Sequence, residues 1–194
     1  MTIPRSPSAQ KALGFTFIEL VLVLMLISIM ASIIPAAFSI PPSRQVENNA
    51  TMIATQLEMA RTESLSNRRL VQIAFNVGAG TYTGYVDHDG DDVIGAVSAE
   101  TAAFPEFSER SLSDLVVFGR GSAAAVPGDD TSDAVTLPGT ALTLNDQGIP
   151  DPWGTMGTIY LAHSREPTAV AAISVSSAGS FKVWRWDDDA ASWR

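Results

Sequence analysis

The chain begins with a short polar stretch that gives way abruptly to one long apolar block. Residues 1–14 are polar or small and carry Arg5 and Lys11, whereas residues 15–40 contain Glu19 as their single ionisable side chain. As an α-helix, the block would measure roughly 39 Å, against a bilayer hydrocarbon core of about 30 Å. Positive charge ahead of the block predicts that this end stays in the cytoplasm. We therefore expect residues 15–40 to form a transmembrane helix.

A cleaved secretory signal peptide is the main alternative for this block. Its apolar region would have about 7–15 residues and would end in a small-x-small cleavage site. The block is longer than that, and the small residues near its end, Ala31 and Ala36, lie within a helix-compatible run. A retained membrane anchor is the better interpretation.

Glu19 is the exception within the block. A carboxylate inside a membrane helix costs about 2.5–3.5 kcal/mol on insertion scales and therefore needs a partner. No Lys or Arg lies nearby after Lys11. The sequence itself predicts that the partner is on another chain or is a newly created amine.

Beyond the block, apolar positions follow a helical period. Pro41 and Pro42 break the first helix, and we expect Ser43 to cap the next one. Apolar or small residues then recur at steps of three and four, which is one helical stripe. The stripe consists of Val46, Ala50, Ile53, Leu57, Ala60 and Ser64. The opposite side of the helix, which we expect to face solvent, consists of Glu47, Asn48, Gln56, Glu63 and Asn67. We expect residues 41–69 to pack on a globular domain, with a coiled-coil dimer as the alternative.

From residue 70 the period changes to two, which is typical of strands. Residues 70–75 and 81–86 flank a turn and predict a β-hairpin. Further strands are expected at residues 115–118, 134–137, 141–144, 158–163, 169–176 and 181–186, separated by Gly, Pro and Asp clusters. A long N-terminal helix followed only by strands predicts an α+β fold in which the helix packs on an antiparallel sheet.

Composition and charge argue against several classes of function. Acidic residues outnumber basic ones by 21 to 12, giving a net charge of −9, which opposes attraction to a nucleic-acid backbone. The lack of cysteine excludes disulfides, thiolate metal sites and cysteine nucleophiles. The two histidines, His88 and His163, have no recognisable acid–base partner, and no nucleophile elbow or phosphate-binding loop occurs. We therefore do not expect the chain to be an enzyme. If it were one, the alternative would be a membrane-tethered periplasmic enzyme.

Alternating carboxylates follow the second strand of the hairpin. Asp87, Asp89 and Asp91 form the oxygen-rich arrangement that calcium prefers. The match to an EF-hand is poor, because the required glycine would fall at Asp92 and the closing glutamate at Ser98. A solvated turn is the first interpretation. A calcium-stabilised loop with these three aspartates as ligands is the alternative, and no other cofactor is expected.

The junction between the polar start and the apolar block resembles the processing site of type IV prepilins and type II secretion pseudopilins. It consists of Gly14-Phe15-Thr16-Phe17-Ile18-Glu19-Leu20 behind a charged leader. The resemblance implies that a membrane-bound prepilin peptidase cleaves after Gly14, removes residues 1–14 and methylates Phe15. It also implies that Glu19 pairs with such an N-terminus during filament assembly, which supplies the missing cation.

Within these families, the chain most resembles the H-type minor pseudopilins and the FimT-type minor pilins. The matching segments are residues 60–69, 144–148 and 173–186. The resemblance implies a single-pass inner-membrane protein with a cytoplasmic N-terminus. Residues 41–69 would be the second half of the long helix, and residues 70–194 a periplasmic β-rich domain.

The function implied by this resemblance is structural. The chain would be a minor pseudopilin of a type II secretion pseudopilus, assisting protein secretion across the outer membrane. The alternative is a minor type IV pilin acting in pilus assembly, motility or DNA uptake. The implied partners are other pseudopilins or pilins, the prepilin peptidase and the inner membrane.

Some FimT-type pilins bind DNA through a C-terminal Gly-Arg-x-Arg-like segment. The corresponding stretch here, residues 179–182, lacks the first arginine, and the acidic residues 187–189 follow and would repel phosphate. Lys182 and Arg185 are the candidate DNA contacts. Trp184, Trp186 and Trp193 are candidates for base stacking, although tryptophan at a strand end is more often core or interface. We expect no DNA binding.

Overall fold

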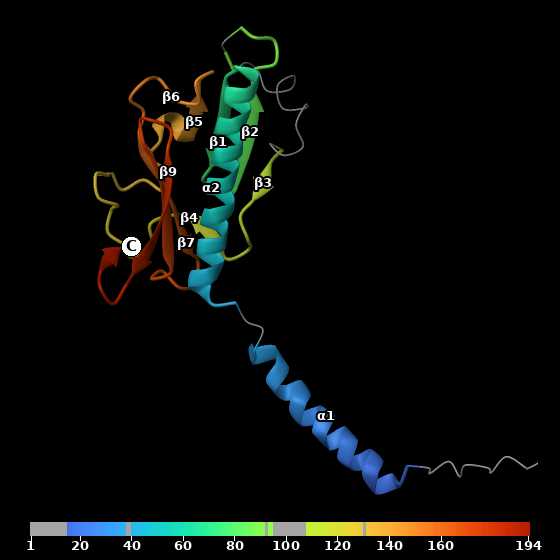
Figure 1. Ribbon diagram of the computed structural model, residues 1–194. Helices are drawn as coiled ribbons and strands as arrows, with labels where there is room; N and C mark the ends of the chain where they lie inside the picture. The colour runs from blue at the N-terminus through green and yellow to red at the C-terminus, as the bar shows by residue number, and fades with distance from the viewer. Residues whose placement is uncertain (1–14, 38–39, 92, 95–107, 130) are drawn as a thin grey trace, which may run out of the picture. The chain divides into compact units, whose positions relative to one another are not determined.

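The computed structural model describes residues 15–37, 40–91, 93–94, 108–129 and 131–194 (Figure 1). The chain divides into an N-terminal unit that ends at Ile40 and a globular unit that begins at Pro41. The leader expected at residues 1–14 lies outside the described residues, and so does Asp92.

The N-terminal unit contains one helix, α1 (Phe17–Ala37). Every side chain from Phe15 to Ala31 is exposed, and nearly all of them are apolar. Among the residues that the structure describes, no helix has the combination of length and apolarity needed to cross a membrane. The membrane-spanning role of residues 15–40 stays a prediction from the sequence.

The globular unit begins with helix α2 (Pro42–Asn67). Pro42 occupies the first helical position, where a missing N–H is harmless because no carbonyl would accept it. Pro41 is the N-cap, and its carbonyl accepts hydrogen bonds from the N–H groups of Arg44 (3.0 Å) and Gln45 (3.1 Å). The expectation that Ser43 caps this helix is therefore wrong, because Ser43 lies inside it.

Ten strands of the described chain form two five-stranded antiparallel sheets, where the sequence led us to expect one. The first sheet has the order β3-β2-β1-β5-β6, and the second has the order β10-β9-β8-β7-β4. The first consists of β1 (Val71–Asn76), β2 (Thr81–Val86), β3 (Arg110–Ser111), β5 (Ala141–Leu144) and β6 (Pro150–Asp151). The second consists of β4 (Val116–Phe118), β7 (Gly157–His163), β8 (Val170–Val175), β9 (Phe181–Asp187) and β10 (Ser192–Trp193).

The expected hairpin is confirmed, since β1 and β2 pair from Val71 with Val86 to Asn76 with Thr81. The prediction of a strand at residues 134–137 is wrong. Val135 makes only an isolated bridge to Ile159, and the 3-10 turn Pro138–Thr140 follows at once. Proline cannot continue a ladder because it has no N–H to donate.

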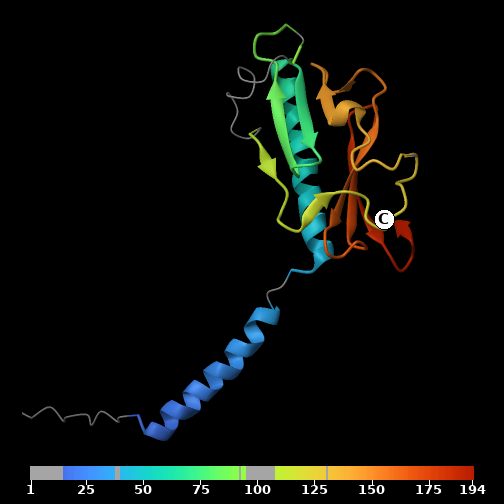
Figure 2. The same ribbon diagram turned by 180° about the vertical axis from the view of Figure 1, so that it is seen from behind.

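Helix α2 lies along both sheets and joins them into one core. It contacts β1 and β5 of the first sheet and β7, β8 and β9 of the second, in front of the strands in Figure 1 and behind them in Figure 2. All six residues of the predicted stripe are fully buried, so that prediction is confirmed. The core they join includes Ile73, Leu142, Leu144, Ile159, Leu161 and Ile173.

The solvent-facing side predicted for α2 is wrong at Gln56, which is only 6% exposed. Two sheets bury a wider arc of the helix than a single sheet would. Asn49 is also buried, against the loop between β3 and β4. Its side-chain N–H donates to Ser113 Oγ (3.0 Å), and its Oδ1 accepts from the Ser113 backbone N–H (3.1 Å).

Candidate functional site

The start of α1 carries the residues on which a processing and assembly site would depend. Thr16 precedes the helix, and its side-chain oxygen (3.3 Å) and carbonyl oxygen (3.1 Å) both accept the backbone N–H of Glu19. Thr followed three residues later by Glu is the sequence signature of a capping box, and a carboxylate in the first turn is favourable to the helix dipole. We did not predict this role of Thr16, although the Thr-x-x-Glu spacing contained the signal.

Glu19 itself is exposed. The two ion pairs of the described residues, Arg185 with Glu47 and Arg194 with Asp187, do not involve it. Phe15 is 78% exposed, and Gly14 lies outside the described residues. The cleavage after Gly14, the methylation of Phe15 and the assembly role of Glu19 stay predictions.

The three segments that carry the H-type resemblance meet in the globular unit. A Cβ added to Gly148 would lie 3.0 Å from side-chain atoms of Arg61 and Leu65 in α2. A Cβ added to Gly179 would lie only 2.4 Å from the carbonyl oxygen of Gly148. Both glycines have positive φ, 68° and 74°, which side chains rarely adopt. These segments therefore form a close packing contact between α2 and two turns.

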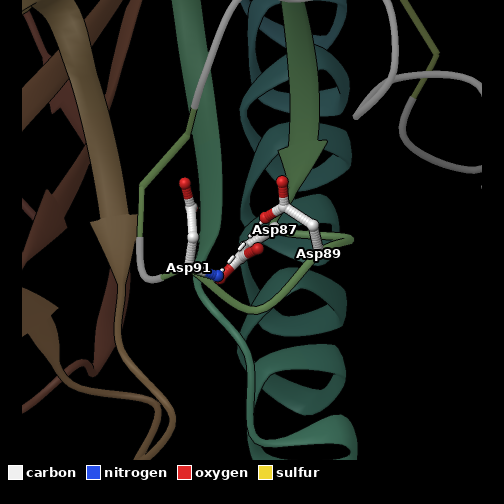
Figure 3. A group of neighbouring side chains, drawn as sticks. All are labelled: Asp87, Asp89 and Asp91. Carbon is white, nitrogen blue, oxygen red and sulfur yellow. Dashed lines mark hydrogen bonds between the residues drawn. The ribbon is translucent and has the colours of Figure 1, made fainter.

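The acidic loop after β2 brings together the three aspartates predicted from the sequence. Figure 3 shows Asp87, Asp89 and Asp91 where the chain leaves the strand, and one carboxylate oxygen from each lies within 4.8 Å of the other two. Asp87 is buried, at 1% exposed, and the other two are exposed. Calcium binds 6–8 oxygen ligands, so three carboxylates alone would make an incomplete site.

Hydrogen bonds within this loop support the turn interpretation. Asp87 Oδ1 accepts the Gly90 N–H at 2.7 Å, and Asp91 Oδ1 accepts the Val93 N–H at 2.9 Å. Asp89 Oδ1 accepts the Asp91 N–H at 3.3 Å, the bond drawn dashed in Figure 3. Each carboxylate thus holds a backbone amide two or three residues ahead, as in Asx turns.

The histidines serve local structure. The buried ring of His163 accepts the backbone N–H groups of Glu166 (3.1 Å) and Arg165 (3.3 Å) at Nδ1 and so caps the turn after β7. His88 lies beside Arg69, whose guanidinium donates to the His88 carbonyl oxygen at 3.2 Å.

The candidate DNA contacts lie on opposite faces of β9, because side chains alternate along a strand and Lys182 and Arg185 are three residues apart. Arg185 forms an ion pair with Glu47 of α2. The Lys182 ammonium lies 3.2 Å from the centre of the Trp184 ring. The two cations therefore do not form one basic patch.

The tryptophans expected at core or interface positions cover the face of the second sheet that is turned away from α2. Trp186 and Trp193 pack edge to face with ring centres 5.3 Å apart, and the Trp193 indole donates to the Ala124 carbonyl oxygen at 3.0 Å. With Trp184, they flank the buried residues Ala123, Val126, Tyr160, Ala162, Val170 and Ala172. These rings are used in packing.

Tyr160 ties the loop before residue 130 to this sheet. Its hydroxyl donates to Asp129 (2.9 Å) and accepts the Val126 N–H (2.9 Å). Burial raises the pKa of the Tyr160 phenol above its ordinary value, so the hydroxyl stays protonated and remains a donor to Asp129. A hollow of about 680 Å³ lies beside this contact, lined by Asp129, Met156, Lys182 and Trp184 among others.

Neither a protein-family model nor a curated protein sequence matches the chain. Among solved structures, the chain is similar to the type IV minor pilin FimU of Pseudomonas aeruginosa, with 15% identity and a TM-score of 0.48 over 72% of this chain and 88% of FimU. It is also similar to the minor pseudopilin EpsH of the Vibrio cholerae type 2 secretion system. There the identity is 10% and the TM-score 0.48, over 73% of this chain and 97% of EpsH. At these identities the similarity is one of fold alone.

Proposed function

We propose that the chain is the precursor of a pilin-like subunit that is anchored in the inner membrane and assembles into a periplasmic filament. The observation that carries this proposal is the exposed surface of α1, on which Glu19 is the one charged side chain among the described residues. An all-round apolar helix requires an apolar environment, which lipid or neighbouring apolar helices supply. Residues 15–40 provide the anchor, and residues 41–194 lie in the periplasm.

Glu19 links the anchor to assembly. Cleavage between Gly14 and Phe15 removes the leader and creates a new amine on Phe15, four residues before Glu19. A carboxylate in the membrane is stabilised by a nearby cation, so Glu19 pairs with the amine of a neighbouring subunit and sets the register between adjacent helices. The prepilin peptidase is the partner for processing, and other subunits are the partners for assembly.

The assembly proposed first is the type II secretion pseudopilus, with a minor type IV pilin as the alternative. A DNA-uptake role is opposed by the placement of Lys182 and Arg185 on opposite faces of β9 and by the net charge of −9. Deletion of the gene distinguishes the secretion role from the pilin role. Loss of an exported protein with normal pili supports the secretion role, and loss of pili or motility with normal secretion supports the pilin role.

The assembly role is tested with Glu19→Ala in the full chain. We expect the variant to be processed and inserted normally but to be recovered in the sheared filament fraction at less than about a tenth of the wild-type amount, because removing an intramembrane ion pair leaves the amine unpaired. Glu58→Ala, which removes an exposed carboxylate from α2, is the matched control and should assemble normally. Normal recovery of Glu19→Ala would show that Glu19 has no pairing role.

A further inference from the structure

Strand β9 has one open edge. On one side it pairs with β8 from Phe181 to Arg185. On the other side, β10 pairs only with Trp186 and Asp187, and Arg194 exchanges two backbone hydrogen bonds of 3.0 Å with Arg185. No strand in the described part of the chain covers the outer edge of β9 from Phe181 to Trp184. These four residues are called the β9 edge.

The direction of each backbone group along this edge follows from the ladder. In an antiparallel ladder, alternate residues direct both their N–H and C=O groups to the same neighbouring strand. Arg185 directs its groups outward, to Arg194. Val183 and Phe181 therefore also direct theirs outward, whereas those of Lys182 and Trp184 face β8. The β9 edge presents two outward N–H groups and two outward C=O groups.

We propose that the β9 edge is a docking site for an extended segment of a partner protein, which adds to the second sheet as a new strand in line with β10. Only an extended backbone matches donors and acceptors repeated at every second residue, which is the chemistry of β-augmentation. The new strand also covers the Val183 side chain, which is 37% exposed.

Lys182 determines the charge of that partner. Its side chain is exposed and forms no ion pair with a described residue. A residue directly across the ladder lies about 4.5–5.5 Å away between Cβ atoms, where opposite charges attract and like charges repel. The partner segment therefore carries an Asp or Glu opposite Lys182.

The same lysine disfavours a second copy of this chain as the occupant. Arg194 already lies across from Arg185, so two copies would pair through Phe181 to Trp184 alone. The register in which Phe181 of each copy bonds Val183 of the other places Lys182 directly across from its own copy. That pairing sets two like charges against each other, as on edges that resist self-association. The β9 edge belongs to the globular unit, so this inference is separate from membrane anchoring and processing.

The test uses a tethered strand in place of the partner. Five residues, Thr-Val-Glu-Val-Thr, are appended after Arg194 of the full chain in detergent. Since Arg194 lies across from Arg185, the appended Glu falls opposite Lys182. We expect the amide of Val183 to exchange with deuterium at least about tenfold more slowly than in the unextended chain, because it becomes hydrogen-bonded. A matched strand with Lys in place of Glu should protect the Val183 amide only in the Lys182→Glu variant, where the two charges are again opposite.

Val183→Pro provides the structural control. Its lost N–H points outward, so β8 and β9 remain paired and the melting temperature stays near that of the wild type, as proline is tolerated on edges. The appended Glu strand should then give no protection at Phe181. Lack of protection by the Glu strand in the wild-type chain would overturn the docking site, and equal protection by the Glu and Lys strands would overturn the acidic partner.

Discussion

Short side-chain acceptors shape the loops of the globular unit. Asp87, Asp89 and Asp91 each hold a backbone N–H group nearby, and Asn145 Oδ1 does the same for Gln147 and Ile149, both at 3.0 Å. Asp and Asn favour such turns because their side-chain oxygens reach amides two or more residues ahead. These three acidic side chains, which lower the net charge, are thus also structural.

We expect calcium to have little effect on the acidic loop. Millimolar calcium should raise the melting temperature of residues 41–194 no more than magnesium does, because only three carboxylates converge there among the described residues. Thermal unfolding followed by circular dichroism measures this. A calcium-specific rise that is lost in Asp89→Ala would establish a metal site and replace the turn interpretation.

At the residue scale, the sequence predicted the clustering of the three aspartates because they are neighbours in one turn. It also contained the signal that separates Lys182 from Arg185, since three steps along a strand change faces. The burial of Gln56 was not predictable from the helical stripe. It depends on a second sheet whose strands lie far away in the sequence.

At the element scale, the long periodic segments were predictable and the two-residue strands were not. Helix α2 and the β1–β2 hairpin carry enough repeats to define their buried faces. Strands β3, β6 and β10 have two residues each, too few for a period, and are defined by pairing with strands already in place. The isolated bridge at Val135 is the opposite case, in which a β-like pattern is interrupted by Pro138.

The contact between Gly148 and Gly179 should be sensitive to a single methyl group. Gly179→Ala introduces a side chain at φ 74° and 2.4 Å from a backbone oxygen. We expect it to destabilise residues 41–194 by about 2–5 kcal/mol, combining left-handed strain with overpacking. Urea unfolding measures the loss of free energy.

Gly154→Ala is the matched control for this substitution. Gly154 also has a positive φ, 91°, but a Cβ there would meet nothing within 4 Å. Gly154→Ala should lower the free energy of unfolding only by the cost of the left-handed conformation, about 1–2 kcal/mol. Equal losses in the two variants would show that the turns around Gly148 and Gly179 separate at little cost.

At the scale of the whole molecule, the apolar helix and the globular unit differ in what they do with their apolar side chains. Helix α1 exposes its apolar side chains from Phe17 to Ala31, whereas α2 buries its stripe against its own two sheets. In the proposed filament, α1 provides contacts between subunits, and the globular unit presents a surface that includes the β9 edge. The sequence predicted the division, because an uninterrupted apolar block and an amphipathic stripe are separated by Pro41 and Pro42.

Residues 41–194 should be monomeric and should not bind DNA at physiological salt. The fragment loses Arg5 and Lys11 and stays strongly acidic, so the phosphate backbone is repelled. Gel filtration and a DNA titration measure the two properties. Stable oligomers would assign part of the surface to self-association, and salt-dependent binding lost in Lys182→Ala or Arg185→Ala would indicate DNA uptake.

The mass of the mature protein, purified from its native membranes, tests the central claim most directly. The new amine on Phe15 and its pairing with Glu19 both depend on cleavage between Gly14 and Phe15. Intact-mass and N-terminal peptide analysis should find a chain that begins at Phe15 and carries one methyl group on its amine. A mature chain that begins at any other residue, or that begins at Phe15 without the methyl group, would contradict the account.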